Sequence, residues 1–398
     1  MAVRAVASGR HWQWRAGQEA AGRLQRLAYA DAGKRDLRLD FLRGVAVSVM
    51  VIDHVGGDTI LTALSGANQF IVSAAEAFVF LSGLIVGVVY GDRFRSLGIV
   101  QATRGLLRRA ATLYKASVGM ALVFLGLFWF TDIRLWFDRS NSPTTGDPIQ
   151  VVTGILTLRF AFHGSDVLVM YTLMMLVAPA VLYLMHQGRT PLVVAGSVAL
   201  WAVYQSHPEG AALPWVVGNS AFQVAAWQLL FVLGMAVGFH RKQVENWLLG
   251  GGNRAWPTIL IATLMVVALV RANALYGSLP LPSEWWGDAT FGSMFAKASL
   301  GPGRVLAFLA IAALAYNLVN ALWVPLSRLL GWFLVPLGQN SLYVYITHLF
   351  VLVLMYNLAP IALIWIPIAA VNLAAQSITL CLVWTMVRTR FLFGLIPR

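Results

Sequence analysis

The chain has 398 residues, of which 59% are hydrophobic and 11% are charged, and its mean hydropathy is +0.72. This composition excludes an ordinary soluble protein, in which about a quarter of the residues are charged. The formal charge of +13 does not indicate nucleic-acid binding, because the basic residues are dispersed between apolar stretches. The single cysteine, Cys381, excludes an intramolecular disulfide and a metal site with several thiolate ligands.

Residues 1–38 form a basic N-terminal arm that lacks an apolar run. A cleaved signal peptide requires such a run, so we interpret the arm as cytoplasmic, with a candidate interfacial helix around His11 to Leu27. Residues 39–398 are predicted to form one transmembrane domain, with no soluble domain besides the arm.

Ten apolar stretches follow the arm, each close to the roughly 20 residues that a helix needs to cross the hydrocarbon layer. They lie near residues 39–58, 70–90, 110–131, 165–186, 191–206, 222–239, 257–275, 304–320, 334–356 and 362–387. Helices are expected because lipid offers no partner to unpaired backbone groups, and because the stretches lack the alternation of a membrane strand. The sequence therefore predicts an all-α, polytopic membrane helical bundle of about ten transmembrane helices.

Lysine and arginine residues are unequally distributed over the loops between these stretches. With a cytoplasmic N-terminus, the inner loops and the C-terminal segment contain Arg93, Arg95, Arg104, Arg108, Arg109, Lys115, Arg189, Arg241, Lys242, Arg254, Arg328, Arg388, Arg390 and Arg398. The outer side contains fewer, namely Arg134, Arg139, Arg159, Arg271, Lys297 and Arg304. Because basic residues accumulate on the cytoplasmic side, both termini are predicted to lie inside.

Charged side chains within apolar spans are functional candidates, because each costs roughly 2.5 to 3.5 kcal/mol to insert. The first span contains Asp40, Arg43, Asp53 and His54. Arg43 and His54 lie within about 20° of one helix face and about 16 Å apart along the axis. Glu76 in the second span is expected at a depth similar to that of His54, which would allow carboxylate and imidazole to meet.

The ninth span contributes further polar groups at this depth. Ser341, Tyr345 and His348 share one helix face, and Asn340 directly precedes them. An imidazole can take a proton from a hydroxyl at neutral pH, and a nearby carboxylate can select its tautomer. His54, Asp53, Glu76 and His348 are therefore predicted catalytic residues. The alternative is that they form only interhelical hydrogen bonds and ion pairs.

Several other residues are predicted to bind substrate. Trp285 and Trp286, in the outer loop of residues 277–303, suit stacking against a sugar, although an aromatic belt at the membrane interface also explains them. Ser82 is more typical of close helix packing but is kept as a candidate. The remaining candidates are Arg43, Asp40, Asn340, Ser341 and Tyr345.

Four stretches carry a resemblance that extends over most of the membrane portion. They read RDLRLDFLRGVAVSVMVIDH (residues 35–54), EAFVFLSGLIVGVVYG (76–91), FQVAAWQLLFVLG (222–234) and LGQNSLYVYITH (337–348). In these stretches the chain resembles the OpgC-type glucan succinyltransferases of the acyltransferase-3 superfamily. Arg43 and His54 match the superfamily's pattern of an arginine, ten residues and a histidine, and the resemblance implies that this histidine is catalytic.

One superfamily motif is not intact. An Arg-x-x-Arg motif is usual at the start of the third span, but here Arg109 is followed three residues later by Thr112. Arg108, Arg109 and Lys115 are still expected to bind CoA phosphates through their charge. The alternative is that they serve only as a positively charged anchor on the cytoplasmic side.

The resemblance implies a multi-pass O-acyltransferase of the bacterial inner membrane. It would transfer a succinyl group from cytoplasmic succinyl-CoA to hydroxyls of a periplasmic glucan, with acyl-CoA as donor substrate, no permanently bound cofactor and no metal. His54 would be the general base, and His348, Tyr345 or Asn340 would stabilise the oxyanion. A two-step route through an acyl-histidine stays open.

The expected partners are the glucan or another envelope carbohydrate, acyl-CoA and the lipid bilayer, with no nucleic acid and with a homo-oligomer left open. One alternative function is an acetyltransferase that acts on another envelope polysaccharide. The other is a proton-coupled transporter or flippase, in which Asp53, His54, Glu76 and His348 form a proton relay.

Overall fold

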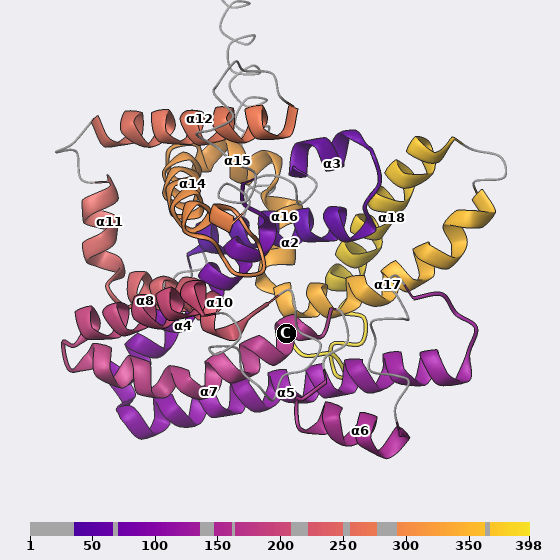
Figure 1. Ribbon diagram of the computed structural model, residues 1–398, viewed down its shortest axis with the longest axis horizontal. Helices are drawn as coiled ribbons and strands as arrows, with labels where there is room; N and C mark the ends of the chain where they lie inside the picture. The colour runs from indigo at the N-terminus through magenta and orange to yellow at the C-terminus, as the bar shows by residue number, and fades with distance from the viewer. Residues whose placement is uncertain are drawn as a thin grey trace, which may run out of the picture.

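The computed structural model describes residues 36–66, 71–135, 147–160, 164–207, 222–249, 255–276, 293–362 and 367–398. Within these ranges the chain is built of helices and contains no β-strand (Figure 1). Almost all of the basic arm, including the candidate interfacial helix, and the pair Trp285 and Trp286 lie outside the described residues.

Helices occupy all ten of the predicted stretches. The elements are α2 (Leu37–Val55), α3 (Ile60–Ser65), α4 (Ala74–Leu97), α5 (Ile99–Phe130), α6 (Pro148–Leu156), α7 (Asp166–His186), α8 (Thr190–Ser206), α10 (Val224–Phe239), α11 (Arg241–Leu249), α12 (Ala255–Tyr276), α14 (Pro302–Ala321), α15 (Trp323–Leu329), α16 (Gly331–Gln339), α17 (Ser341–Ala362) and α18 (Ile368–Thr389). The first of these begins after Asp36, whose carboxylate accepts a hydrogen bond from the main-chain N–H of Arg38 at 3.0 Å.

Among the described residues, six helices are long and apolar enough to cross a membrane. These are α4, α5, α7, α14, α17 and α18, and α10 with α11 makes a seventh if this pair, bent by 88°, is one span. α2 is not counted among these helices because it contains four charged residues, Arg38, Asp40, Arg43 and Asp53. The protein is thus an all-α polytopic membrane protein, and the count of ten spans stays a prediction.

α4 and α10 are held at close range by glycines on both helices. A Cβ atom on Gly83 or Gly87 would overlap the carbonyl oxygen of Phe231 or Met235 in α10. Gly234 and Gly238 are placed in the same way against the main chain of α4. This is the packing of small residues spaced four apart that membrane helices use to bring their backbones together.

The predicted ninth span is interrupted. α16 ends at Gln339, Asn340 takes φ −117° and ψ 31°, and α17 begins at Ser341. Pro336 lacks an amide donor, and Gly338 lies so close to α2 that a Cβ would overlap the carbonyl oxygen of Asp40. The predicted span 334–356 is therefore not one continuous helix. The distance of His348 from the inner end of its own helix is measured from Ser341.

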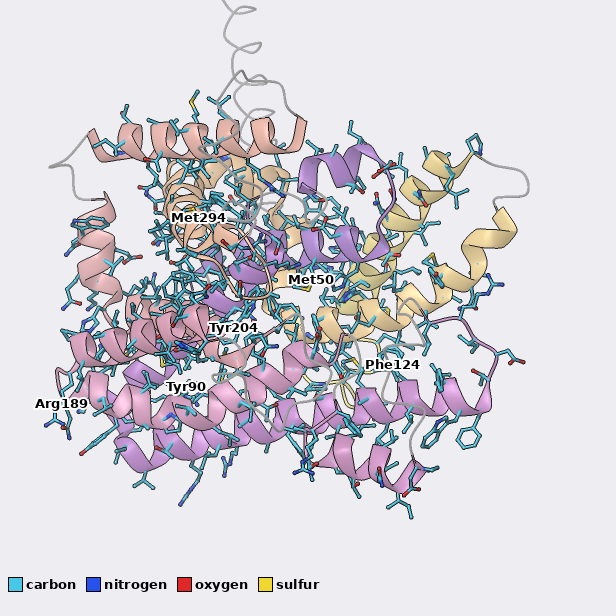
Figure 2. The ribbon with its side chains drawn as sticks, in the orientation of Figure 1. Met50, Tyr90, Phe124, Arg189, Tyr204 and Met294 are labelled. Atoms are coloured by element: carbon cyan, nitrogen blue, oxygen red, sulfur yellow. The ribbon has the colours of Figure 1, made fainter. Side chains whose placement is uncertain are left out.

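α2 runs through the middle of the molecule, and α5 and α7 lie side by side below it in Figure 1. Its residue Met50 is buried and lies near the centre of the side-chain view (Figure 2). α4, α16, α17 and α18 also pack against α2. The charged and polar groups of this helix therefore face protein on several sides, which lowers the cost of keeping them in a membrane span.

Candidate active site

His54 and His348 form a hydrogen-bonded pair that joins the C-terminal end of α2 to the middle of α17. Nδ1 of His54 lies 2.8 Å from Nε2 of His348, and the two rings are stacked with centroids 5.1 Å apart. Nδ1 of His348 lies 3.1 Å from the carbonyl oxygen of Val344, one helical turn earlier. His348 is fully buried, whereas His54 is exposed.

These contacts select the tautomers of both rings when the pair is neutral. A carbonyl oxygen only accepts, so Nδ1 of His348 carries its proton and Nε2 is the acceptor. Nδ1 of His54 must then donate to it, which leaves Nε2 as the basic nitrogen of His54. His54 is thus arranged to accept a proton at Nε2, and the resulting positive charge would strengthen its hydrogen bond to His348.

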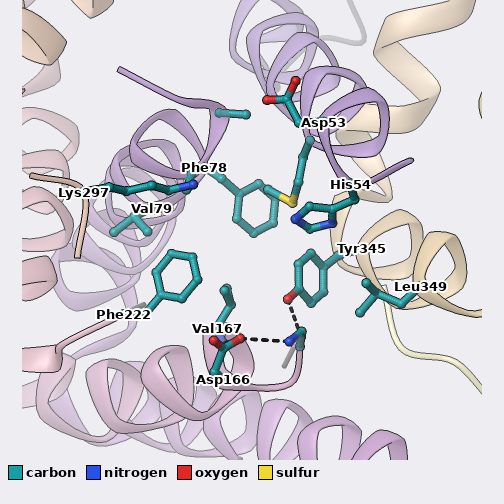
Figure 3. Close-up of a pocket in the computed structure, with 14 residues that line it drawn as sticks. Asp53, His54, Phe78, Val79, Asp166, Val167, Phe222, Lys297, Tyr345 and Leu349 are labelled. Atoms are coloured by element: carbon teal, nitrogen blue, oxygen red, sulfur yellow. Dashed lines mark hydrogen bonds between the residues drawn. The ribbon is translucent and has the colours of Figure 1, made fainter. Parts of the chain in front are cut away.

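His54 lines a cavity of about 280 Å³ among the helix ends that are predicted to face the outside (Figure 3). Its walls come from α2, the start of α4, the start of α7, the residue Phe222 before α10, Lys297 before α14, and α17. The polar groups on the wall are Asp53, His54, Asp166, Lys297 and Tyr345, and the aromatic rings include Phe78 and Phe222. The cavity therefore offers a base, a cation, carboxylates and flat apolar faces to one ligand.

The carboxylate of Glu76 does not line this cavity. It accepts hydrogen bonds from the main-chain N–H and the hydroxyl of Ser73, at 2.8 and 2.6 Å. It also forms an ion pair with Arg304 at the start of α14, and both side chains are buried. Glu76 thus caps α4 and ties it to α14, and the hydrogen-bond partner at Nδ1 of His54 is a histidine rather than a carboxylate.

Asp53 lines the cavity and accepts a hydrogen bond from the hydroxyl of Ser65 at the end of α3. Across the cavity, burial lowers the pKa of Lys297 below that of an ordinary lysine, and the positive charge of Arg304 acts in the same direction. The negative charges of Glu76, Asp53 and Asp166 oppose this shift in the pKa of Lys297. Lys297 is accordingly a cation whose charge is more easily lost than that of a surface lysine.

Tyr345 and Asp166 are both bound to the main chain at Gly164 (Figure 3). The hydroxyl of Tyr345 donates to the carbonyl oxygen of Gly164. The carboxylate of Asp166 accepts from the N–H groups of Gly164 and Val167, at 3.2 and 2.9 Å. The segment before α7 is in this way fixed against α17.

Arg43, nearer the N-terminal end of α2 than His54, does not line the cavity and donates a hydrogen bond to the hydroxyl of Ser341. Ser82, in α4, is half-buried and does not line the cavity of His54. Ser341, Tyr345 and His348, which share a face of α17, therefore contact Arg43, Gly164 and His54 respectively. Asp40 is buried in the first turn of α2 and does not line the cavity of His54.

The predicted CoA-binding residues lie elsewhere. Arg108 and Lys115 are exposed on α5, and Arg109 donates a hydrogen bond to the main-chain oxygen of Arg398. Asn340 bonds to the carbonyl oxygen of Pro336 at 2.9 Å and lines a different cavity, beside Arg388 and Arg390. None of these residues reaches the cavity of His54.

Two polar residues of the cavity were not among the predicted site residues. Lys297 was counted only as an outer basic residue, and Asp166 was not singled out. Asp166 is the first residue of α7, where an acidic residue has an ordinary structural explanation, and Lys297 lies in the loop before α14. A search for charges deep within the apolar stretches therefore did not single them out.

Comparison with protein families gives one finding that covers nearly all of the described helices. A family model described as OpgC protein matches residues 35–391, which include His54, Lys297 and His348. Searches of curated proteins and of solved structures found no match. Because the family match covers far more than half of the sequence, the chain belongs to the OpgC protein family.

Proposed function

We propose that this membrane-bound OpgC-type acyltransferase transfers an acyl group, succinyl by preference, from cytoplasmic acyl-CoA to hydroxyls of a periplasmic glucan in the bacterial inner membrane. His54 is the general base. The observation that carries the proposal is the contact between His54 and His348, because it leaves Nε2 of His54 as the basic nitrogen in a ligand-sized cavity.

The cavity suits a sugar acceptor that enters from the predicted outer side. Phe78 and Phe222 provide flat apolar surfaces, on which the C–H faces of a glucose ring can stack. Asp53 and Asp166 provide hydrogen-bond acceptors for its hydroxyls. A glucan hydroxyl held between these groups would lie beside His54.

The acyl transfer begins with proton transfer to His54. Nε2 of His54 takes the proton of the glucan hydroxyl, and the oxygen attacks the thioester carbonyl carbon. The tetrahedral oxyanion is stabilised by the hydroxyl of Tyr345 as it turns from Gly164. The oxyanion then collapses, the C–S bond breaks, and the CoA thiolate receives the proton from His54, giving a glucan ester and free CoA.

Lys297 supplies the preference for succinyl over acetyl. A succinyl group carries a free carboxylate, and an acetyl group does not. Among the described residues that line the cavity, Lys297 is the basic one besides His54, so its ammonium group is the partner for that carboxylate. His348 does not line the cavity and acts through His54, which makes it a positioning residue.

The test uses the purified protein in lipid nanodiscs with succinyl-CoA and a glucan. We expect CoA release together with a succinyl mass increment on the glucan, and we expect His54→Ala to abolish both while the fold is retained. His186→Ala is the matched control, because His186 is an exposed histidine in the last turn of α7, outside the cavity. Glucan transport across the membrane of proteoliposomes without CoA release would replace the proposal with the transporter alternative.

A further inference from the structure

A second cavity, of about 530 Å³, lies where α16 ends and α17 begins. We call it the arginine cavity. It is lined by Pro336, Gln339, Asn340, Val387, Arg388, Arg390, Phe393 and Arg398. No residue lines both this cavity and that of His54. By the distribution of basic residues, it lies on the predicted cytoplasmic side.

The arginines are brought together by the way the chain turns after α18. Arg390 and Leu392 take positive φ values of 56° and 52°, which reverse the chain direction. The carbonyl oxygen of Phe391 then accepts a hydrogen bond from Tyr343 at 2.6 Å, and the ring of Phe393 packs on Tyr343 with centroids 4.7 Å apart. The segment is thereby bound to the first turn of α17.

A further contact fixes the end of this segment. Arg109 of α5 donates a hydrogen bond to the main-chain oxygen of Arg398. Arg109, predicted from its charge to contact CoA, therefore holds the wall of the arginine cavity in place. The cavity is thus lined by α16, α18 and the segment after α18, and contacts with α5 and α17 hold that segment in place.

Three arginine side chains, those of Arg388, Arg390 and Arg398, line this cavity. No acidic side chain is among the described residues that line it, and the sequence contains no aspartate or glutamate after Asp288. The ring contacts of Arg388 with Trp384 and of Arg398 with Phe393 leave their charge uncompensated. Guanidinium groups match phosphate oxygens in geometry and charge, so a ligand with several phosphate groups is the expected occupant.

The arginine cavity is also at a suitable distance from the histidine pair. Ser341 follows Asn340 directly and is the residue that Arg43 contacts. His348 lies about 12 Å beyond Asn340 along α17. CoA carries its phosphates at one end and its thioester at the end of a long flexible arm, so this arm can follow the face of Ser341 and Tyr345 toward His54.

We propose that the arginine cavity binds the phosphate groups of the acyl-CoA donor. The inference rests on the proposed function for the identity of the donor. Its location rests on the cavity and on the three arginine side chains that line it without an acidic side chain among the described residues. Phosphate groups are also present on anionic lipid headgroups, so the test must separate these two sources.

The experiment measures CoA binding by isothermal titration calorimetry, using the full chain in nanodiscs of zwitterionic lipid. We expect Arg388→Gln and Arg398→Gln each to weaken CoA binding by about tenfold. These side chains are exposed, so their replacement should leave the fold intact. Arg328→Gln is the matched control, since Arg328 is an exposed arginine at the end of α15, outside the cavity.

Two further arms complete the design. Dephospho-CoA, which lacks the 3′-phosphate, should bind more weakly than CoA to the wild type. If one of the two arginines contacts the 3′-phosphate, its replacement by glutamine should weaken the binding of dephospho-CoA less than it weakens the binding of CoA. His54→Ala should bind CoA with wild-type affinity although it transfers no acyl group, which separates failure of the chemistry from failure of the binding site.

The proposal is overturned if the wild type does not bind CoA, or if both cavity variants bind it as the wild type does. It is also overturned if Arg108→Gln and Lys115→Gln weaken CoA binding while the cavity variants do not. A second set of nanodiscs contains anionic lipid. If the cavity variants lose binding of that lipid and still bind CoA as the wild type does, the cavity is assigned to lipid headgroups and the proposal is overturned. If CoA binds as proposed but no glucan is acylated, the proposed function fails and the cavity assignment stands.

Discussion

His54 and His348 are joined by a hydrogen bond between Nδ1 of the first and Nε2 of the second, 2.8 Å long, across the contact of α2 with α17. Because His348 is itself bound to the carbonyl oxygen of Val344, the ring that faces the cavity is oriented by a ring that does not. His348 therefore orients the ring of His54 and selects its tautomer, as a carboxylate does for a histidine in many other sites.

This relationship predicts a graded effect of substitutions at His348. His348→Leu should lower kcat by about 100-fold with little change in KM, because His54 loses the acceptor that selects its tautomer. His348→Gln should retain more activity, because its side-chain oxygen can accept the same hydrogen bond. The measurement is steady-state CoA release, and equal losses in the two variants would contradict the positioning role.

Lys297→Met should raise KM for succinyl-CoA by about tenfold and leave KM for acetyl-CoA nearly unchanged, because only succinyl carries a carboxylate to pair with the lysine. Lys297→Arg keeps the charge and serves as the control. Acylation rates with both donors, measured side by side, test this. A similar change in KM for both donors would remove Lys297 from donor selection.

The pH dependence follows from the lowered pKa of Lys297. The ammonium form is present below that pKa, so the preference for succinyl-CoA over acetyl-CoA should fall as the pH rises through it, at a lower pH than for an ordinary lysine. In Lys297→Arg the preference should persist to higher pH, because arginine stays protonated. The ratio of kcat/KM for the two donors, measured across neutral to alkaline pH, gives the comparison.

The buried ion pair of Glu76 with Arg304 should be important for stability. Glu76→Gln leaves a buried guanidinium without its counter-charge, so we expect a loss of about 3 to 5 kcal/mol. Asp92→Asn is the control, because Asp92 pairs with Arg95 in an exposed position, where a pair contributes about 1 kcal/mol or less. Thermal unfolding in detergent compares the two, and similar midpoints would contradict the assignment.

Helix contacts can be tested at glycines. Gly338→Ala should destabilise the protein by about 1 to 3 kcal/mol, because the added Cβ would overlap the main chain at Asp40. Gly126→Ala, at a half-buried position within α5 with no atom within 4 Å of its added Cβ, should stabilise by about 0.5 to 1 kcal/mol. Opposite signs in the unfolding midpoint are the expected result.

Much of the architecture could be read from local patterns. The apolar stretches predicted helices at the right places, and the resemblance to the OpgC proteins is confirmed by the family match. The shared face of Ser341, Tyr345 and His348 was also predictable, because helical spacing alone determines it. By contrast, the close contact of Gly338 with Asp40 in α2, beside the interruption at Asn340, could not be predicted, because no window of sequence around residue 340 contains α2.

The sequence by itself determined that this protein resides in a membrane, that it is helical, and which polar groups its spans must accommodate, because composition and periodicity are local properties. Only the tertiary structure decided that His54 meets His348 and that Glu76 instead pairs with Arg304. It also decided that Lys297 enters the cavity and that the C-terminal arginines gather beside Asn340. The reason is physical: the rotation and offset of each helix are set by packing against other helices, and residues far apart in the chain make those contacts.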